Sequence, residues 1–144
     1  MQDLHPGVNY VTHSDIRIVE ATPDRAVGQV ELKEHHQQPY GVVHGGLYCT
    51  LVETLASTGA ALWAMDQGLV GCVGLHNSTD FLRSTREGTL IGEATPIHRG
   101  RTQQLWQVSI TRQGDGKEVA RGQVRLQNLT DDSAIGGIAP RPRS

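Results

Sequence analysis

The longest apolar stretch of the chain, Gly45 to Met65, predicts a helix. Its large apolar side chains recur at helical spacing and cover most of the circumference: Leu47, Tyr48, Leu51, Val52, Leu55, Leu62 and Trp63. A helix that is apolar all round lies inside a protein. Gly45-Gly46 precede the pattern and Gly68 follows it, so we expect a helix over about 45–66 that is buried on nearly every side.

The segments on either side of this helix alternate apolar and polar residues, which is typical of strands. Residues 15–32 predict two strands, or one interrupted strand, around a Pro-Asp turn, and the polar residues 33–43 predict a loop. After the helix, strands are expected over 69–82 and 88–100. A hairpin is expected over 101–129, with its turn at QGDGK.

This order of elements predicts the α+β class, with an antiparallel sheet of five to six strands wrapped around one long helix. The length of 144 residues suits a single domain, 1–144. We expect loose ends over about 1–12 and 130–144.

Charge and cysteine content narrow the class of protein. With 13 basic and 15 acidic residues, the net charge of −2 argues against nucleic acid or an anionic membrane as the partner. The two cysteines, Cys49 and Cys72, form no Cys-x-x-Cys pattern. No signal-peptide layout opens the chain, and Gly, Ser, Thr and Glu53 make residues 45–65 unsuited to a bilayer. We therefore expect a soluble, cytoplasmic protein.

Glu53 is the one formally charged residue between positions 45 and 65. A carboxylate is rarely buried unless it is paired or used in chemistry. The two glycines at the predicted helix start would expose N–H groups that suit a polarised carbonyl oxygen. Together with a carboxylate that attacks or activates water, they predict acyl-transfer hydrolysis. Two simpler readings stay open: the glycines could form only a turn, and Glu53 could pair with a basic group from a strand.

The spacing between Gly45 and Glu53 bears on the number of subunits. Eight residues of helix correspond to about 12 Å along the axis. An oxyanion donor and a carboxylate must both come within about 3–3.5 Å of the reacting carbonyl. One straight helix cannot bring both groups to the same atom, whereas two antiparallel helices can. We therefore predict a symmetric dimer with two shared sites.

Two other features have simpler readings. His35-His36 resemble metal ligands, but adjacent residues point apart and no acidic or thiolate cluster is visible beside them, so we expect no metal site. Cys49, Glu53 and Ser57 share one helical stripe. We interpret Cys49 as a small core residue, because nothing in the sequence indicates a reactive thiolate.

The segment QPYGVVHGGLYCTLVETLAS, residues 38–57, resembles the hot-dog-fold acyl-CoA thioesterases. The resemblance is closest to the branch that holds the PaaI-like enzymes and the Arthrobacter-type 4-hydroxybenzoyl-CoA thioesterase, and it extends over about 15–129. It implies the hot-dog fold, homodimers that commonly pair into homotetramers, and hydrolysis of acyl-CoA without a metal or redox cofactor. Glu rather than Asp at the acidic position favours an aromatic acyl group.

The resemblance also implies roles for five residues. Glu53 matches the nucleophile or general base, and the Gly45 N–H matches the donor that polarises the thioester carbonyl. Gln38 falls near the carbonyl or the attacking water, His44 has a positioning role, and Ser57 helps hold water or the carboxylate. Gln38, His44 and Gly45 would come from one subunit, Glu53 and Ser57 from its partner.

Coenzyme A would require basic residues for its phosphates. The candidates are Arg83, Arg86, Arg99, Arg101, Arg141 and Arg143, with Gly100 and Thr102 beside the pantetheine or nucleotide. Residues 99–102 form the best cluster, although any of these arginines could simply lie on a solvated face. Two alternative functions stay open. A hot-dog hydratase or dehydratase is disfavoured by His-Gly-Gly in place of His-Phe-Pro, and a non-catalytic acyl-CoA-binding regulator is disfavoured by Glu53.

Overall fold

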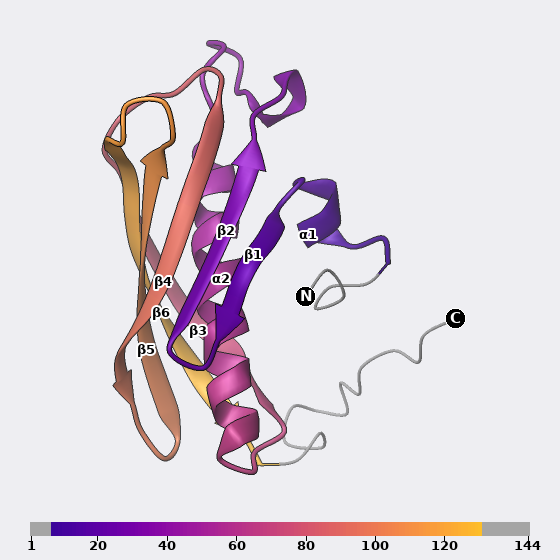
Figure 1. The fold of residues 1–144 in the computed structure, drawn as a ribbon, viewed down its shortest axis with the longest axis vertical. Coiled ribbons are helices and arrows are strands. Elements are labelled where there is room, and N and C mark those ends of the chain that lie inside the picture. Colours follow the sequence, from indigo (N-terminus) through magenta and orange to yellow (C-terminus); the bar gives the residue numbers. More distant parts are fainter. Residues whose placement is uncertain (1–6, 131–144) are drawn as a thin grey trace.

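The computed structural model describes residues 7–130 and consists of a six-stranded sheet with one long helix against it (Figure 1). The elements in chain order are α1 (Tyr10–His13), β1 (Arg17–Thr22), β2 (Arg25–Glu31), the 3-10 turn η1 (Glu34–His36), α2 (Gly45–Asp66), β3 (Gly71–Phe81), β4 (Thr89–Arg99), β5 (Gln103–Arg112) and β6 (Glu118–Leu129). The predicted α+β class and the bounds of the long helix are confirmed. Across residues 7–130, no helix has the length and apolar character that a membrane span requires.

The strands are ordered β1-β2-β4-β5-β6-β3, and every neighbouring pair is antiparallel. β3 is out of chain order because α2 carries the chain across the sheet, from β2 to the far edge beside β6. The expected hairpins are present: the Arg25 N–H donates to Thr22 Oγ1 at 3.0 Å in the first turn, and Gly116 has φ +69° in the second. Within the described residues, β3 pairs only with β6, so its outer edge is open.

Helix α2 packs along one face of the sheet and contacts all six strands. Leu51, Val52 and Leu55 are fully buried there. Leu55 comes close to the sheet because Gly92 has no side chain: a Cβ at that position would lie 2.6 Å from Leu55 Cδ1. Burying an aliphatic side chain of this size stabilises the fold by about 1.5–3 kcal/mol. The glycine on β4 therefore sets how closely the helix approaches the strands.

The helix is not buried on nearly every side, so that expectation is wrong for the isolated chain. Glu53 is exposed, and Cys49 and Ser57 on the same stripe are half-buried. The reason is the topology of the sheet, which covers one side of α2 and ends at β3. The Asn77 amide of this edge strand donates to the Cys49 carbonyl of α2. An open stripe therefore runs along the helix beside the open edge of β3.

The N-terminal segment differs from the expected loose end. Residues Tyr10–His13 form α1, and Asn9 caps it by accepting hydrogen bonds from the Val11 and Thr12 N–H groups at 3.0 and 3.2 Å. Asn is among the preferred N-cap residues because its short side chain reaches the free N–H groups of a first turn. The expected C-terminal loose end lies outside the described residues from position 131 onward.

A buried polar network joins the C-terminal half of α2 to β5 and β6. The Gln104 amide, only 1% exposed, donates to the Ala60 carbonyl at 3.1 Å and to Asn128 Oδ1 at 2.7 Å, and it accepts from Trp106 Nε1 at 2.8 Å. Asn128 in turn donates to the Gly100 carbonyl at 3.0 Å. Every polar atom of the Gln104 side chain thus has a partner, which is the condition under which a buried amide stabilises a fold.

Replacing this amide with an isosteric apolar side chain is expected to destabilise the protein. Gln104→Met leaves the indole N–H of Trp106 buried without an acceptor, so the free energy of unfolding should fall by about 1–3 kcal/mol. Gln107→Met, on the exposed face of the same strand, should change it by less than about 0.5 kcal/mol. Urea unfolding of both variants checks this, and equal stabilities would contradict a stabilising network.

Candidate active site

The first turn of α2 leaves one particular N–H group free. His44 is the N-cap, and its Nδ1 accepts from the Gly46 N–H at 2.8 Å. The His44 carbonyl accepts from the Leu47 N–H at 2.9 Å. Within residues 7–130, the Gly45 N–H donates to no group. It lies at the positive end of a 22-residue helix and is available to an oxyanion or a carbonyl oxygen.

A side chain at either glycine of the motif would displace a neighbouring ring. A Cβ at Gly46 would lie 2.8 Å from His44 Nδ1, so a side chain there would displace the capping imidazole. A Cβ at Gly45 would lie 2.4 Å from Phe81 Cε2. The Phe81 ring at the end of β3 therefore packs directly against the backbone that carries the free N–H.

A hollow of about 260 Å³ opens beside Gly45, and Gln38, Tyr48, Phe81 and Arg83 are among its lining residues. The Gln38 amide is oriented by its own turn, because its Oε1 accepts from the Tyr40 N–H. That bond leaves the NH₂ end of Gln38 as a donor toward a ligand. The hollow thus combines a backbone donor and a side-chain donor with no carboxylate.

Glu53 lies in a different hollow, two turns further along α2. This second hollow has a volume of about 240 Å³ and is lined by residues from three elements: Tyr10, Val11, Cys49, Thr50, Glu53, Thr54 and Asn77. The carboxylate lies against the β3 backbone where Gly74 provides room: a Cβ there would be 3.1 Å from Glu53 Oε1. Ser57, one helical turn later, is half-buried on the same stripe.

A single chain therefore holds the candidate donors and the candidate carboxylate in two different hollows. The donors of Gln38 and Gly45 lie in one hollow, and the carboxylate of Glu53 lies in the other. Along a straight helix axis the two positions are separated by about 12 Å, as the sequence spacing predicts. Both hollows border β3, one at its end near Phe81 and the other near Asn77.

This arrangement can be compared with known proteins. The family model described as the thioesterase superfamily matches residues 40–119, more than half of the chain and all of α2. The chain belongs to the thioesterase superfamily. The predicted hot-dog fold is confirmed, because solved structures of high similarity share it.

Three relatives illustrate the range of this thioesterase family. Rv1847 of Mycobacterium tuberculosis, whose name carries a provisional esterase assignment, is 46% identical over 127 residues, which cover 88% of this chain and 90% of that protein. Its solved structure superposes with a TM-score of 0.83 and covers 86% of this chain and 98% of the other. The 1,4-dihydroxy-2-naphthoyl-CoA hydrolases of Listeria monocytogenes and Escherichia coli are 36% and 32% identical, covering 67% and 71% of this chain and 76% and 74% of theirs.

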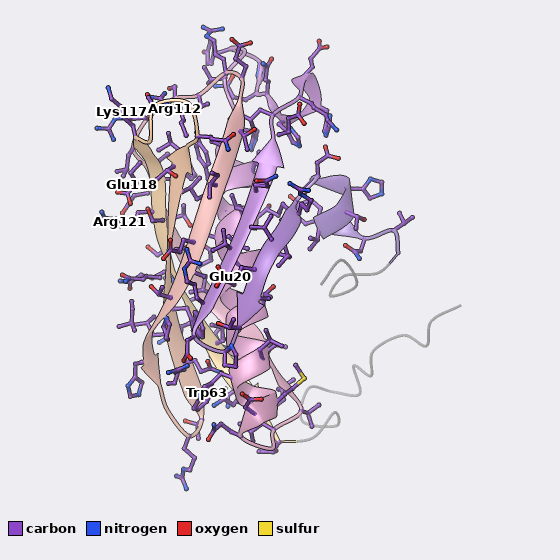
Figure 2. The ribbon with its side chains drawn as sticks, in the orientation of Figure 1. Glu20, Trp63, Arg112, Lys117, Glu118 and Arg121 are labelled. Atoms are coloured by element: carbon purple, nitrogen blue, oxygen red, sulfur yellow. The ribbon has the colours of Figure 1, made fainter. Side chains whose placement is uncertain are left out.

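The arginines predicted to bind coenzyme A fall at two ends of the thioesterase. Arg83 lines the Gly45 hollow, and its guanidinium donates to the Glu118 carbonyl at 2.6 Å. Arg99 instead donates to Asp24 Oδ1 at 2.8 Å and lies 5.5 Å from the ring of Trp63, near the far end of α2 (Figure 2).

The remaining arginine candidates that the structure describes also fall at the two ends of α2. Arg86 lies in the connection between β3 and β4, and its side chain comes close to Gly41, which is in the loop before α2. Arg101 and Thr102 are exposed in the turn after β4, where the Gly100 carbonyl is bonded to Asn128. The structure therefore does not bring residues 99–102 together with Gly45 of the same chain. Arg141 and Arg143 lie outside the described residues.

The histidine pair has an acidic neighbour that the sequence did not reveal. Asp15 Oδ2 lies 2.8 Å from His35 Nε2 and 3.2 Å from His36 Nε2. Both ring nitrogens of His36 have partners, because Nδ1 accepts from the Lys33 N–H at 2.9 Å and Nε2 lies 3.0 Å from the Ser14 carbonyl. Ligation of a metal by His36 would break one of these bonds. Lys33 Nζ, 3.7 Å from Asp15 Oδ1, adds a positive charge that disfavours a cation.

The two cysteines have different surroundings. Burial raises the pKa of the Cys72 thiol to about 11, so it is a thiol at neutral pH. Cys49 is half-buried, and its carbonyl accepts from the Asn77 amide at 3.0 Å. Together with Gly74, this contact holds the Glu53 stripe against β3.

Sequence reasoning missed three residues that shape the two hollows. Phe81 and Asn77 come from β3, and no local pattern shows that this strand borders the helix. Tyr10 comes from α1, where the capping pair Asn9 and Thr12 is a weak signal for a short helix.

His36 makes the loop before α2 sensitive to acid. Its backbone carbonyl accepts from the His44 N–H at 2.9 Å, so it supports the residue that caps α2. Burial is the main reason that the pKa of His36 is lowered. The unfolded chain therefore takes up a proton at higher pH than the folded chain does, and stability falls as the pH falls below about 6.5.

We expect this loss of stability at low pH to disappear in His36→Asn, because the asparagine side chain cannot be protonated. Between about pH 7.5 and about pH 5.5, its unfolding free energy should fall less than that of the parent protein. His98→Asn, at an exposed position on β4, should keep the parent's full pH dependence. Urea unfolding across this range measures the slopes, and identical slopes for all three proteins would contradict the assignment to His36.

Proposed function

We propose that this thioesterase hydrolyses acyl-CoA thioesters, with an aromatic acyl group, to the free acid and CoA. The observation that carries the proposal is the free Gly45 N–H at the start of the same helix that exposes Glu53. Thioester hydrolysis needs a donor for the carbonyl oxygen and a group that attacks or activates water. Two relatives named as 1,4-dihydroxy-2-naphthoyl-CoA hydrolases support an aromatic acyl-CoA as the substrate.

In this mechanism the Gly45 N–H donates to the thioester carbonyl oxygen and stabilises the negative charge that develops on it. The NH₂ group of Gln38 donates to the same oxygen or to the attacking water. Glu53 either attacks the carbonyl carbon, giving a mixed anhydride that water then hydrolyses, or removes a proton from the attacking water. The C–S bond breaks, CoA leaves as the thiolate and takes up a proton, and Ser57 holds water or the carboxylate one turn from Glu53.

The complete site would be formed by two copies of the chain. The open edge of β3 offers unpaired N–H and C=O groups, and such an edge is a surface for pairing with another strand. Leu75 and Phe81 on this strand are 49% and 56% exposed. Antiparallel pairing of two β3 strands about a two-fold axis would place the two α2 helices side by side in opposite directions.

The two hollows would meet in such a dimer. One hollow borders the end of β3 and the other borders its middle. Pairing centred between them would bring Gly45 and Gln38 of one chain toward Glu53 of the other. The apolar and half-buried residues along the α2 stripe would then be covered, which accounts for their exposure in the isolated chain. Two such dimers pairing into a tetramer would be compatible with this arrangement.

Among the basic residues, Arg83 is best placed to meet the CoA chain. Both Arg83 and Arg99 already donate to protein groups, but only Arg83 lines the hollow that holds the Gly45 donor. Arg86, whose side chain lies close to Gly41, could contact a phosphate further along the CoA molecule. In a dimer, the exposed Arg101 and Thr102 would approach CoA from the end of a sheet that lies away from Gly45 of the same chain.

The carboxylate can be tested by Glu53→Gln, which keeps the size of the side chain. Because the amide can neither attack nor accept the proton, kcat for 4-hydroxybenzoyl-CoA should fall by at least about a hundredfold. Glu31→Gln, another exposed glutamate at the end of β2, should retain the parent's rate. Thiol release measured with a thiol reagent gives both rates. A loss of less than about tenfold, or about 1.4 kcal/mol, would remove Glu53 from the chemistry.

The same assay separates thioester hydrolysis from the two alternatives. Hydrolysis releases free thiol across a panel of acyl-CoAs. A hydratase would change the absorbance of an enoyl-CoA without releasing thiol, and a non-catalytic regulator would bind acyl-CoA and do neither. Absence of thiol release from the whole panel would contradict the proposal.

Sharing of the site between subunits has a separate test. Glu53→Gln and Gln38→Ala each disable a different half-site, so each homodimer should be inactive or strongly impaired. A mixed dimer restores one site with both parent residues, and we expect it to recover about half of the parent's activity per dimer. Subunit exchange is followed with differently tagged chains. Recovery that stays at the level of the separate variants after proven exchange would argue for a site within one chain.

A further inference from the structure

The hollow beside Glu53 has a wall that does not come from α2 or the sheet. Tyr10, on the short helix α1, lines this hollow together with Glu53. The Tyr10 backbone is fixed from both sides, because Asn9 caps its helix and the Tyr10 carbonyl accepts from the Ser14 N–H at 3.0 Å and from Ser14 Oγ at 2.9 Å. The side chain is 68% exposed, so its hydroxyl has room for a further partner.

The hydroxyl groups of Tyr10 and Thr50 form a chain of hydrogen bonds in which each hydroxyl donates toward the Gly46 carbonyl. Thr50 Oγ1 lies 2.8 Å from the Gly46 carbonyl, which can only accept, so the single hydroxyl proton of Thr50 is used there. Tyr10 Oη lies 3.0 Å from Thr50 Oγ1. Because Thr50 has no second proton, Tyr10 is the donor in this contact. The phenol oxygen therefore retains a lone pair but has no proton left for a ligand.

We propose that Tyr10 is a specificity-determining residue that selects acyl groups bearing a hydrogen-bond donor, such as a ring hydroxyl. The inference rests on the proposed hydrolysis at Glu53. An acyl group whose carbonyl carbon meets Glu53 extends into the adjacent space, and the space on that chain is the hollow closed by Tyr10. Its volume of about 240 Å³ is below the range of about 300–1,000 Å³ typical of pockets for drug-sized ligands, so it suits an acyl group and not a whole acyl-CoA.

The lining supports a ring with one polar substituent. Val11, Cys49 and Thr54 contribute mainly apolar surface around Glu53, and the Asn77 amide is already bonded to the Cys49 carbonyl. The phenol oxygen of Tyr10 is then an acceptor on a wall otherwise suited to a ring. A hydroxyl on the acyl group would donate to it. A methoxy group at the same ring position would place one lone pair against another.

The test compares matched pairs of hydroxybenzoyl-CoA and methoxybenzoyl-CoA, substituted at the 2, 3 or 4 position. For at least one position, the parent enzyme should have a kcat/KM about three- to tenfold higher for the hydroxyl compound, as one hydrogen bond supplies. Tyr10→Phe should abolish this ratio through a loss on the hydroxyl compound. Tyr40→Phe, a tyrosine that is 86% exposed in the loop before α2, should keep the ratio.

Thr50→Val provides a second variant with a different signature. It removes the acceptor that holds the Tyr10 proton, so the phenol can turn and donate to a methoxy oxygen. The ratio should therefore fall through a gain on the methoxy compound, with little change on the hydroxyl compound. A structural effect of Tyr10 would instead change both compounds alike, and benzoyl-CoA turnover, recorded for each variant, would change with them.

Two outcomes would overturn the inference while leaving the proposed function intact. The parent enzyme could hydrolyse both members of every pair equally, or Tyr10→Phe could keep the parent's ratio. Failure of the parent enzyme to release thiol from any aromatic acyl-CoA would instead overturn the proposed function. Loss of the ratio in Tyr10→Phe, together with the methoxy gain in Thr50→Val, would establish the acceptor role.

Discussion

The arrangement of the site depends on how the first turn of α2 satisfies its N–H groups. A helix start leaves several N–H groups without partners inside the helix. Here the His44 side chain takes the Gly46 N–H and the His44 carbonyl takes the Leu47 N–H, which leaves the Gly45 N–H. One residue thus determines which donor is free. Because its Nδ1 is occupied by the cap, His44 would act by positioning in the proposed mechanism.

The second constraint is the position of β3 at the edge of the sheet. Because α2 crosses the whole sheet before β3 begins, the strand that contacts Glu53 is also the strand with an open edge. This placement leaves a stripe of the most apolar helix uncovered and places the two hollows along one strand. A helix that looked fully buried in sequence is therefore buried by two surfaces: its own sheet on one side and, in the proposed dimer, a second copy on the other.

The sequence was sufficient for the features that follow from local pattern. The bounds of α2, the two hairpins and the lone carboxylate follow from periodicity, glycine positions and turn residues. Other features depend on contacts between distant segments. The orientation of the His44 ring is needed to identify which glycine carries the free N–H. The register of β1, β2 and β4 is needed to see that Arg99 pairs with Asp24. Asp15 beside His35 and His36 depends on a turn with φ 60°, which composition does not reveal.

The same helical turn supplies groups of opposite polarity to the two hollows. Its free N–H, at Gly45, faces the hollow of Gln38, while the Gly46 carbonyl orients Thr50 and, through it, Tyr10 at the hollow of Glu53. In a shared site, one subunit would then contribute the donor for the thioester oxygen. The other would contribute the carboxylate and the acceptor for the far end of the acyl group. Position 46 thereby serves both hollows through its backbone: its N–H fixes His44, and its carbonyl fixes the direction of the hydroxyl chain that ends at Tyr10. A glycine suits this position because a Cβ there would lie 2.8 Å from His44 Nδ1.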